Sequence, residues 1–464
     1  MTESSDPTAS ITTNPTGAGQ LNLVGRMERL PLTKFQIRLF AIIATAWLFD
    51  SMDLAALTFV LAPISKEFHL SLTQAGLVAS LSFAGMVVGA SGAGMLADRF
   101  GRRPVFVTSM IVWGLASFGA AASWDLSSLL VFRFFIGLGM GAEFPVAQAL
   151  LSEFIPASHR GKYLGWLEGF WPIGFIACGA LSVVFVPWLG WRSLFVVEGV
   201  LAAFALVIRR KVPESARWYA SKGRTREADR AVNEFEINVE REYGKPLPPV
   251  RDTLFSEERS STQSPLAELF SPVYRSRTIM AWTLWFCVLL GYYGITTWMG
   301  KLLADQGMTI TKSITFVLLM ALWGIPGFLT ASYLLERLGR RGTVIGFVLL
   351  SAAAAYLYGS STSTIAILVA GSVMQFFFFG MWSALYAYTP EVFPTRARAT
   401  GCGTSSAFGR VGAILGPVIV PVALVNYGKT STFAIAAAFL VIGAIAVWVL
   451  GPETKGKTLE QVSS

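Results

Sequence analysis

The sequence predicts an all-α membrane protein with twelve transmembrane helices in two pseudo-symmetric bundles of six. Hydrophobic residues make up 53% of the 464 residues and charged residues 14%. The mean hydropathy is +0.56, so the chain holds more apolar material than a soluble core could bury. The segment Asp98-Arg99-Phe100-Gly101-Arg102-Arg103 recurs as Glu336-Arg337-Leu338-Gly339-Arg340-Arg341, at an offset of 238 residues. Duplicated membrane bundles are typical of transporters in which one half rocks against the other.

Two further pairs of segments keep nearly the same spacing. Glu153-Phe154-Ile155-Pro156 recurs as Glu391-Val392-Phe393-Pro394, again at an offset of 238 residues. Pro213-Glu214-Ser215 recurs as Pro452-Glu453-Thr454, at an offset of 239 residues. The agreement of three pairs predicts that the second half of the chain duplicates the first.

Apolar stretches of about 20 residues, the length that crosses a bilayer, define the elements in order. In the first half they are 35–64, 74–97, 104–122, 128–154, 163–186 and 191–209. In the second half they are 278–304, 313–335, 342–359, 364–390, 400–424 and 431–450. Lys and Arg are concentrated in alternate loops, which places both termini and the central loop in the cytoplasm. Topology therefore explains the net charge of +9 better than nucleic-acid binding does.

These spans divide the chain into five parts. We expect a disordered cytoplasmic tail over 1–34, an N-terminal bundle over 35–209, a cytoplasmic linker with short amphipathic helices over 210–277, a C-terminal bundle over 278–451 and a cytoplasmic tail over 452–464. The sequence shows no metal-ligand spacing, phosphate loop or nucleophile–base set. It therefore predicts neither a metal site nor a cofactor, and an enzyme is the least favoured class.

Charged residues inside the spans of the first half are candidates for proton coupling, because a carboxylate in mid-membrane is costly unless paired. Asp50 and Asp53 share a helix face. A rise of ~1.5 Å per residue places Arg133 at their depth. One guanidinium cannot neutralise two carboxylates, so we expect one acid to take a proton, with a structural ion pair as the alternative. Glu143 and Glu168 form a candidate proton exit path, or else hydrogen-bond neighbouring helices.

The repeated loops predict a cytoplasmic gate in each half. Gly101 allows a tight turn, and the acids and arginines are expected to bridge helix ends while the cytoplasmic side is closed. A purely topological role of the basic residues is the alternative. The predicted gate residues are Asp98, Arg99, Gly101, Arg102, Arg103, Glu153, Arg160, Glu336, Arg337, Gly339, Arg340, Arg341, Glu391 and Arg398.

With these motifs the chain resembles the major facilitator superfamily over essentially all of 35–455. Its Pro-Glu-Ser and Pro-Glu-Thr segments look like sugar-porter signatures, and Phe49-Asp50-Ser51-Met52-Asp53 is similar to the acidic pair of aromatic-acid/proton symporters. Three tracts look most like bacterial niacin transporters and their synaptic-vesicle-glycoprotein relatives: Gly141-Ala142-Glu143-Phe144-Pro145, Phe170-Trp171-Pro172-Ile173-Gly174 and Met381-Trp382-Ser383-Ala384-Leu385. The resemblance implies uptake of a small aromatic carboxylate such as nicotinate.

A substrate site follows from these tracts. In the family fold, spans 5 and 10, which carry Trp171 and Trp382, face each other across the bundles, and there an indole can stack on a flat ring. Arg410, inside an apolar span, offers a planar fork for a carboxylate. The candidate hydrogen-bonding residues are Tyr292, Tyr293, Gln375 and Tyr386. Ordinary packing is the alternative for each aromatic residue, and pairing with a helix carbonyl or an acid for Arg410.

The sequence thus predicts a bacterial inner-membrane secondary transporter that imports a small aromatic monocarboxylate, nicotinate first, together with a proton by rocker-switch alternating access. Its expected partners are that substrate, protons and membrane lipids, with no nucleic acid, and we expect a monomer. The alternatives are a sugar or polyol proton symporter, a carrier of another aromatic acid such as benzoate, and a membrane receptor without transport.

Overall fold

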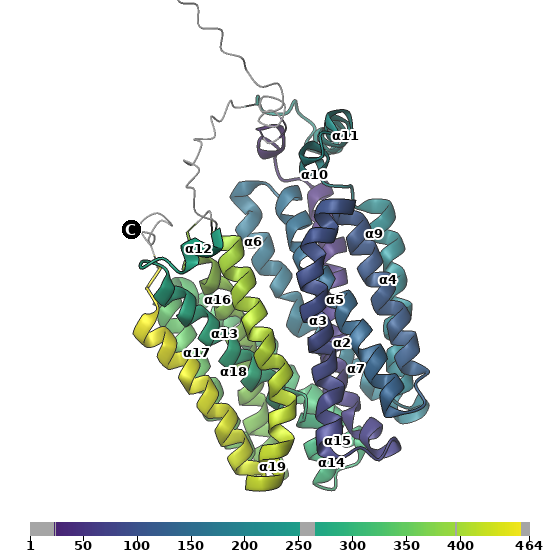
Figure 1. The fold of residues 1–464 in the computed structure, drawn as a ribbon, viewed down its shortest axis with the longest axis vertical. Helices are drawn as coiled ribbons and strands as arrows, with labels where there is room; N and C mark the ends of the chain where they lie inside the picture. The colour runs from purple at the N-terminus through teal and green to yellow at the C-terminus, as the bar shows by residue number, and fades with distance from the viewer. Residues whose placement is uncertain (1–22, 24, 251–264, 395–396, 456–464) are drawn as a thin grey trace, which may run out of the picture.

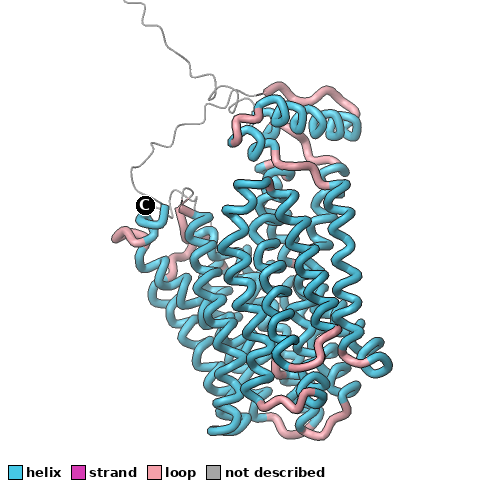
Figure 2. Tube along the Cα trace, turned by 45° about the vertical axis from the view of Figure 1, so that its right-hand side comes forward, coloured by secondary structure: helices cyan, strands magenta, loops and turns pink. Residues whose placement is uncertain are grey.

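The computed structural model describes residues 23, 25–250, 265–394 and 397–455, and the regular structure in these residues is helical. Two helical bundles stand side by side, with the short helices α10, α11 and α12 grouped at one end (Figure 1). In the second view, helices make up nearly the whole length of both bundles, and the loops gather at the two ends (Figure 2). Ten helices in the described residues are long and apolar enough to cross a membrane. The chain is therefore an all-helical membrane protein, as the sequence predicts.

The first half follows the predicted order of spans. It begins with α2 (Lys34–Glu67), α3 (Leu72–Phe100), α4 (Arg102–Ala121) and α5 (Leu126–Phe154). The fifth span is divided at Gly169 into α6 (Ala157–Glu168) and α7 (Phe170–Leu189). The sixth consists of α8 (Arg192–Leu201), the 3₁₀ turn η1 (Ala202–Phe204) and α9 (Ala205–Lys211). Because these three pieces are short, the sixth span is not among the ten long helices.

The second half repeats this order with different breaks. The seventh span consists of α13 (Arg275–Thr296) and α14 (Met299–Asp305), and the eighth of α15 (Ile310–Ala321) and α16 (Gly324–Leu338). Then come α17 (Arg340–Ser360), α18 (Thr364–Tyr388), the 3₁₀ turn η2 (Thr389–Glu391) and α19 (Arg398–Leu450). The element α19 contains both final predicted spans, which are two helices separated at Gly428, whose φ of 75° is not helical.

The short helices between the two bundles, which the sequence predicts to be cytoplasmic, lie at the bundle end that carries the predicted gate loops (Figure 1). They are α10 (Ala216–Ser221), α11 (Thr225–Tyr243) and α12 (Pro265–Leu269). The predicted end of the disordered tail, residue 34, is too late. The chain is already helical over 25–28, and Arg26 Nη2 lies 2.5 Å from Glu236 Oε2 of α11. The Thr, Ser and Pro bias that suggested disorder ends near residue 20.

Parts of three predicted segments lie outside the described residues. These are residues 1–22 of the first tail, 251–264 of the linker and 456–464 of the last tail.

The two halves meet through the membrane-embedded helices, away from the gate loops. Ser80 Oγ, eight residues into α3, donates a hydrogen bond to the carbonyl oxygen of Ile414 in α19 at 2.7 Å. The rings of Phe175 and Phe379 lie 5.8 Å apart. At the end of the bundles opposite α11, helix α14 packs against α2 (Figure 1). These contacts bring the middle of each half towards the other and leave each gate cluster with its own half.

Candidate functional site

The predicted acids and arginine of the first half form a buried cluster. Arg133 Nη1 of α5 lies 3.3 Å from Asp53 Oδ1 and 3.5 Å from Asp53 Oδ2 of α2. The side chains are 1% and 0% exposed. The Arg133 guanidinium also lies 5.7 Å from the ring centroid of Phe195 on α8. Asp53 and Arg133, eighty positions apart in the sequence, therefore meet at the common depth that the helical rise predicts.

A further acid, Glu198 of α8, joins this pair and was missed in the sequence. Its side chain is fully buried, and it interacts electrostatically with Asp53 and with Arg133. The available signal was the one that identified Asp50, an acid inside an apolar span. Glu198 stands seven residues into the predicted sixth span.

Asp50 and Glu143 form a second carboxyl pair, between α2 and α5. They are 1% and 0% exposed, and the two carboxyl groups interact electrostatically. None of their four oxygens has a hydrogen-bond partner among the described residues. Two ionised carboxylates buried next to each other would repel and would lack hydrogen bonds to offset their burial. This arrangement favours a proton on one of the two acids.

Glu168, at the end of α6, contacts other residues than these two pairs do. Gln148 Nε2 donates to Glu168 Oε1 at 3.1 Å. Glu168 also interacts by charge with Tyr386 of the other half. Its carboxylate therefore belongs to the surface where the halves face each other, whereas Glu143 belongs with Asp50.

Arg410 of α19 faces the first half from the second. Its guanidinium lies 5.6 Å from the ring centroid of Phe144 on α5. Its polar neighbours are the phenols of Tyr293 and Tyr386. Within the described part of the chain no carboxylate makes an ion pair with it. A half-buried guanidinium without a counter-charge has its strongest hydrogen bonds still to make.

The phenols of Tyr293 and Tyr386 lie next to this arginine, and two further aromatic side chains of the second half pack against them. Trp382 and Tyr386 are stacked at 5.8 Å with an angle of 29° between the rings. Tyr292 and Tyr293 lie 5.3 and 6.3 Å from Trp382. The Trp382 Nε1 and Tyr292 hydroxyl groups have no hydrogen-bond partner among the described residues. Four of the predicted substrate residues are therefore assembled, and two of them present open donors.

Two predicted substrate residues occupy other surroundings. Trp171 of α7 lies on the first half, 5.8 Å from Phe144, and so borders Arg410 through that ring. Gln375 of α18 is fully buried, and its Nε2 donates to Met299 Sδ at 3.7 Å. Gln375 packs inside the second half, where methionine accepts from its amide nitrogen and its amide oxygen has no hydrogen-bond partner among the described residues.

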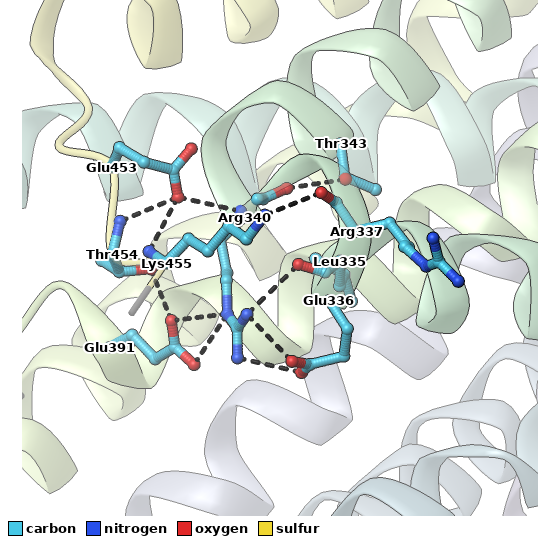
Figure 3. A network of polar contacts seen from close by, with 10 residues as sticks. Leu335, Glu336, Arg337, Arg340, Thr343, Glu391, Glu453, Thr454 and Lys455 are labelled. Atoms are coloured by element: carbon cyan, nitrogen blue, oxygen red, sulfur yellow. Dashed lines mark hydrogen bonds and ion pairs between the residues drawn. The ribbon is translucent and has the colours of Figure 1, made fainter. Parts of the chain in front are cut away.

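The gate of the second half is a closed network of polar contacts (Figure 3). Arg340 Nε donates to Glu391 Oε2 at 3.2 Å, and its Nη2 donates to Glu336 Oε1 at 3.0 Å. Thr454 Oγ1 donates to the same Glu391 at 2.5 Å. The backbone amides of Arg340 and Lys455 donate to Glu453 Oε1 at 3.0 and 2.9 Å. This network ties α17, η2 and the segment after α19 to one another.

Glu453 lies beyond the last span, and its surroundings favour the ionised form. Burial alone raises the pKa of this carboxyl group, but the backbone amides that donate to it, with those of Lys455 and Arg340 first, hold the pKa below its ordinary value. Glu453 is therefore charged at neutral pH and holds the turn before α17.

The gate of the first half repeats this network. Arg102 forms an ion pair with Glu153, and Ser215 Oγ donates to Glu153 Oε2 at 2.5 Å. The backbone amides of Arg102 and Arg103 donate to Glu214 at 3.0 and 3.2 Å. Glu214 and Ser215 therefore do for this half what Glu453 and Thr454 do for the other.

One glycine in each gate fits its position for the same two reasons. Gly101 and Gly339 have φ of 103° and 98°, which other residues rarely adopt. A Cβ at Gly101 would collide with the Glu214 carboxylate, and one at Gly339 with that of Glu453. The repeated sequence segments thus form the same turn in both halves, and a glutamate carboxylate accepts hydrogen bonds at each turn.

Some gate residues do not bridge as expected. The carbonyl oxygen of Asp98 accepts a hydrogen bond from Trp218 Nε1 at 2.8 Å, while Arg160 pairs with Glu28 at 3.0 Å. The Arg102–Glu153 and Arg340–Glu391 pairs each lie inside one half. They therefore do not require a closed cytoplasmic side, in contrast to the expectation from the sequence.

The outer arginines of the gates contact rings and carbonyl groups. Arg99 and Arg337 each lie 5.3 Å from a ring centroid, of Phe100 and Tyr333 respectively. Arg341 donates to the carbonyl oxygen of Trp448, and Arg398 begins α19.

Paired helical bundles with mirrored gates, buried acids and an unpaired arginine between the halves are the features of a membrane transporter. The Major Facilitator Superfamily model matches residues 43–345 and 325–464. The chain belongs to this superfamily and is a secondary transporter, not an enzyme.

Individual relatives cover nearly the whole chain. The niacin transporter NiaP of Acinetobacter baylyi is 38% identical over 444 residues, which is 95% of this chain and all of that protein. The inner membrane metabolite transport protein YdjE of Escherichia coli is 31% identical over 443 residues, 94% of this chain and 97% of that one. A partially occluded inward-open structure of the E. coli xylose transporter XylE matches with a TM-score of 0.72 at 16% identity, covering 92% and 100%. At this identity the structural match supports the fold alone.

Proposed function

We propose that the protein imports a small aromatic monocarboxylate, nicotinate first, together with a proton across a bacterial inner membrane. The observation that carries this proposal is Arg410, a guanidinium without a carboxylate partner among the described residues, set between the halves amid Phe144, Tyr293 and Tyr386. The 38% identity to a protein named as a niacin transporter supports the same substrate class.

The site offers each part of such an anion a complementary partner. A carboxylate can accept two parallel N–H bonds from Arg410, and charge-assisted bonds contribute about 1.5–3 kcal/mol each. A flat pyridine ring against an aromatic side chain gains about 0.5–1.5 kcal/mol beyond area burial. The open Trp382 Nε1 and Tyr292 hydroxyl donors fit a ring nitrogen or a carboxylate oxygen. A polyol would leave the guanidinium without its counter-charge.

The buried acids supply the proton chemistry. Four carboxyl groups, those of Asp50, Asp53, Glu143 and Glu198, share one guanidinium, that of Arg133. One positive charge cannot balance four negative ones in a buried site, so protons must balance part of the charge. Gain or loss of such a proton changes the attraction between α2, α5 and α8, and this biases the arrangement of the helices.

Uptake of radiolabelled nicotinate into proteoliposomes, with and without an inward proton gradient, tests the proposal. We expect gradient-dependent accumulation that benzoate inhibits and glucose does not. Inhibition by glucose without inhibition by benzoate would favour the sugar symporter. Absence of nicotinate uptake in sealed liposomes with correctly inserted protein would reject the aromatic-acid assignment.

A further inference from the structure

Phe144 connects two tryptophans of the first half to Arg410 of the second. Its ring lies 4.7 Å from that of Trp47, at 83°, and 5.8 Å from that of Trp171, at 35°. The Arg410 guanidinium lies over the same ring from across the interface. Among the described rings, that of Phe144 is the one that Arg410 covers. Phe144 is 9% exposed.

The geometry fixes which part of the ring faces the interface. Trp47 meets the ring nearly at right angles, an edge-to-face contact that holds it in one orientation. Arg410 is attracted to the face, where the quadrupole of the ring is negative. When the guanidinium turns from this face to a bound carboxylate, the face becomes available to the ring of the same ligand.

We propose that Phe144 determines specificity for an aromatic ring: it supports the Arg410 guanidinium in the empty protein and stacks on the ring of the bound carboxylate. This role rests on the proposed function, because it assumes that Arg410 receives the carboxylate. A saturated ring of the same size can fill the space but lacks the flat π face. Phe144 therefore stabilises aromatic acids beyond what shape alone would allow.

The test compares two acids that differ in aromaticity, nicotinate and cyclohexanecarboxylate. Their dissociation constants are measured on the purified full chain in nanodiscs, for the unchanged protein, F144L and F144Y. We expect the unchanged protein to prefer nicotinate. F144L should lower this preference about 2- to 12-fold, the factor that corresponds to about 0.5–1.5 kcal/mol of aromatic geometry. F144Y retains a ring and should keep the preference.

Phe175 offers a matched control, because its ring also meets the other half, at Phe379, without contacting Arg410. F175L should leave the preference unchanged. F144M, which removes the ring with a similar volume, replaces F144L if that variant does not fold.

The outcomes separate the two proposals. An unchanged preference in F144L or F144M, or a protein that binds both acids equally, would overturn the role of Phe144 while the carboxylate site stands. If the unchanged protein binds neither acid, the proposed function itself fails.

Discussion

In the first half, Glu153 accepts hydrogen bonds from Arg102 and Ser215, and in the second half Glu391 accepts them from Arg340 and Thr454. A second glutamate in each half, Glu214 or Glu453, closes the turn at a glycine with positive φ. The ends of the two halves that carry these glutamates therefore repeat the same main polar contacts.

Within the membrane the two halves differ. The positions equivalent to Asp50 and Asp53 are Val288 and Gly291, so the acid cluster has no copy there. The second half instead contributes Arg410 and its aromatic neighbours. The two halves thus share their turns but differ in their buried charged residues. Under the proposed function, the proton would bind in the first half and the anion next to Arg410 of the second, so coupling would pass through the surface where the halves meet.

The largest effect should follow from removing the acids of the first half. A one-to-one proton symport can accumulate a monovalent anion about tenfold per unit of pH gradient. The double variant D50N/D53N should lose this accumulation and reach equal concentrations, while exchange of labelled for unlabelled nicotinate persists. The measurement is radiolabelled uptake and counterflow in proteoliposomes.

An acid of the second half provides the control for this variant. Asp305 is half exposed and pairs with Lys301, so D305N should accumulate nicotinate normally. Undiminished proton-driven accumulation in D50N/D53N would show that the acid cluster is structural.

The next effect concerns the anion group of the second half. R410Q removes the charge, and R410K keeps it without the planar fork. Loss of a buried charge partner costs about 2–5 kcal/mol, so R410Q should weaken nicotinate binding at least about 30-fold, and R410K by less. The measurement is equilibrium binding of labelled nicotinate to purified protein. R192K, at an ion pair with Glu67 elsewhere in the chain, serves as control, and equal affinities in R410Q and R192K would contradict the assignment.

The sequence was sufficient where the relevant pattern is local. Apolar length predicted the spans, and the repeated motifs predicted the matching turns at Gly101 and Gly339, because turn chemistry depends on neighbouring residues. Even Asp53 and Arg133 followed from helical rise. The contact of Phe144 with Arg410 depends on how α5 and α19 approach each other, and no local pattern encodes that. The bridge from Glu28 to Arg160 was missed for the same reason.

A smaller effect tests the repetition of the gates. E153Q and E391Q each remove the charge that accepts from an arginine and a hydroxyl group. We expect each to lower the stability of the protein in detergent by about 1–3 kcal/mol, since hydrogen bonds to charged groups contribute in that range. Thermal unfolding followed by tryptophan fluorescence measures both. The losses should be similar, and they should add in the double variant because the clusters are separate. A loss confined to one half would show that the repeated contacts are not equivalent.

The smallest effect concerns a contact of the first half that has no counterpart among the described residues of the second half. Arg26 and Arg29 both bind Glu236 of α11, at 2.5 and 2.8 Å. Burial alone raises the pKa of Glu236, but the hydrogen bonds from the two arginines lower it below its ordinary value. A lowered pKa means that the contact stabilises the protein above the unfolded-state pKa of 4.5 and that this contribution is lost as pH falls through the folded-state value.

The variant E236Q should therefore be less stable than the unchanged protein by about 0.5–1 kcal/mol at pH 7, and the difference should shrink under acidic conditions. Thermal unfolding at pH 7 and at an acidic pH measures this difference in stability. Glu234, exposed on the same helix, provides the control E234Q, which should match the unchanged protein at both. If E236Q is as stable as E234Q at pH 7, the N-terminal segment is held by its apolar contact instead, in which Leu23 packs against Ala228 and Val232. In either case the contact between the N-terminal segment and α11 stabilises the first half through residues that are not part of the repeated segments.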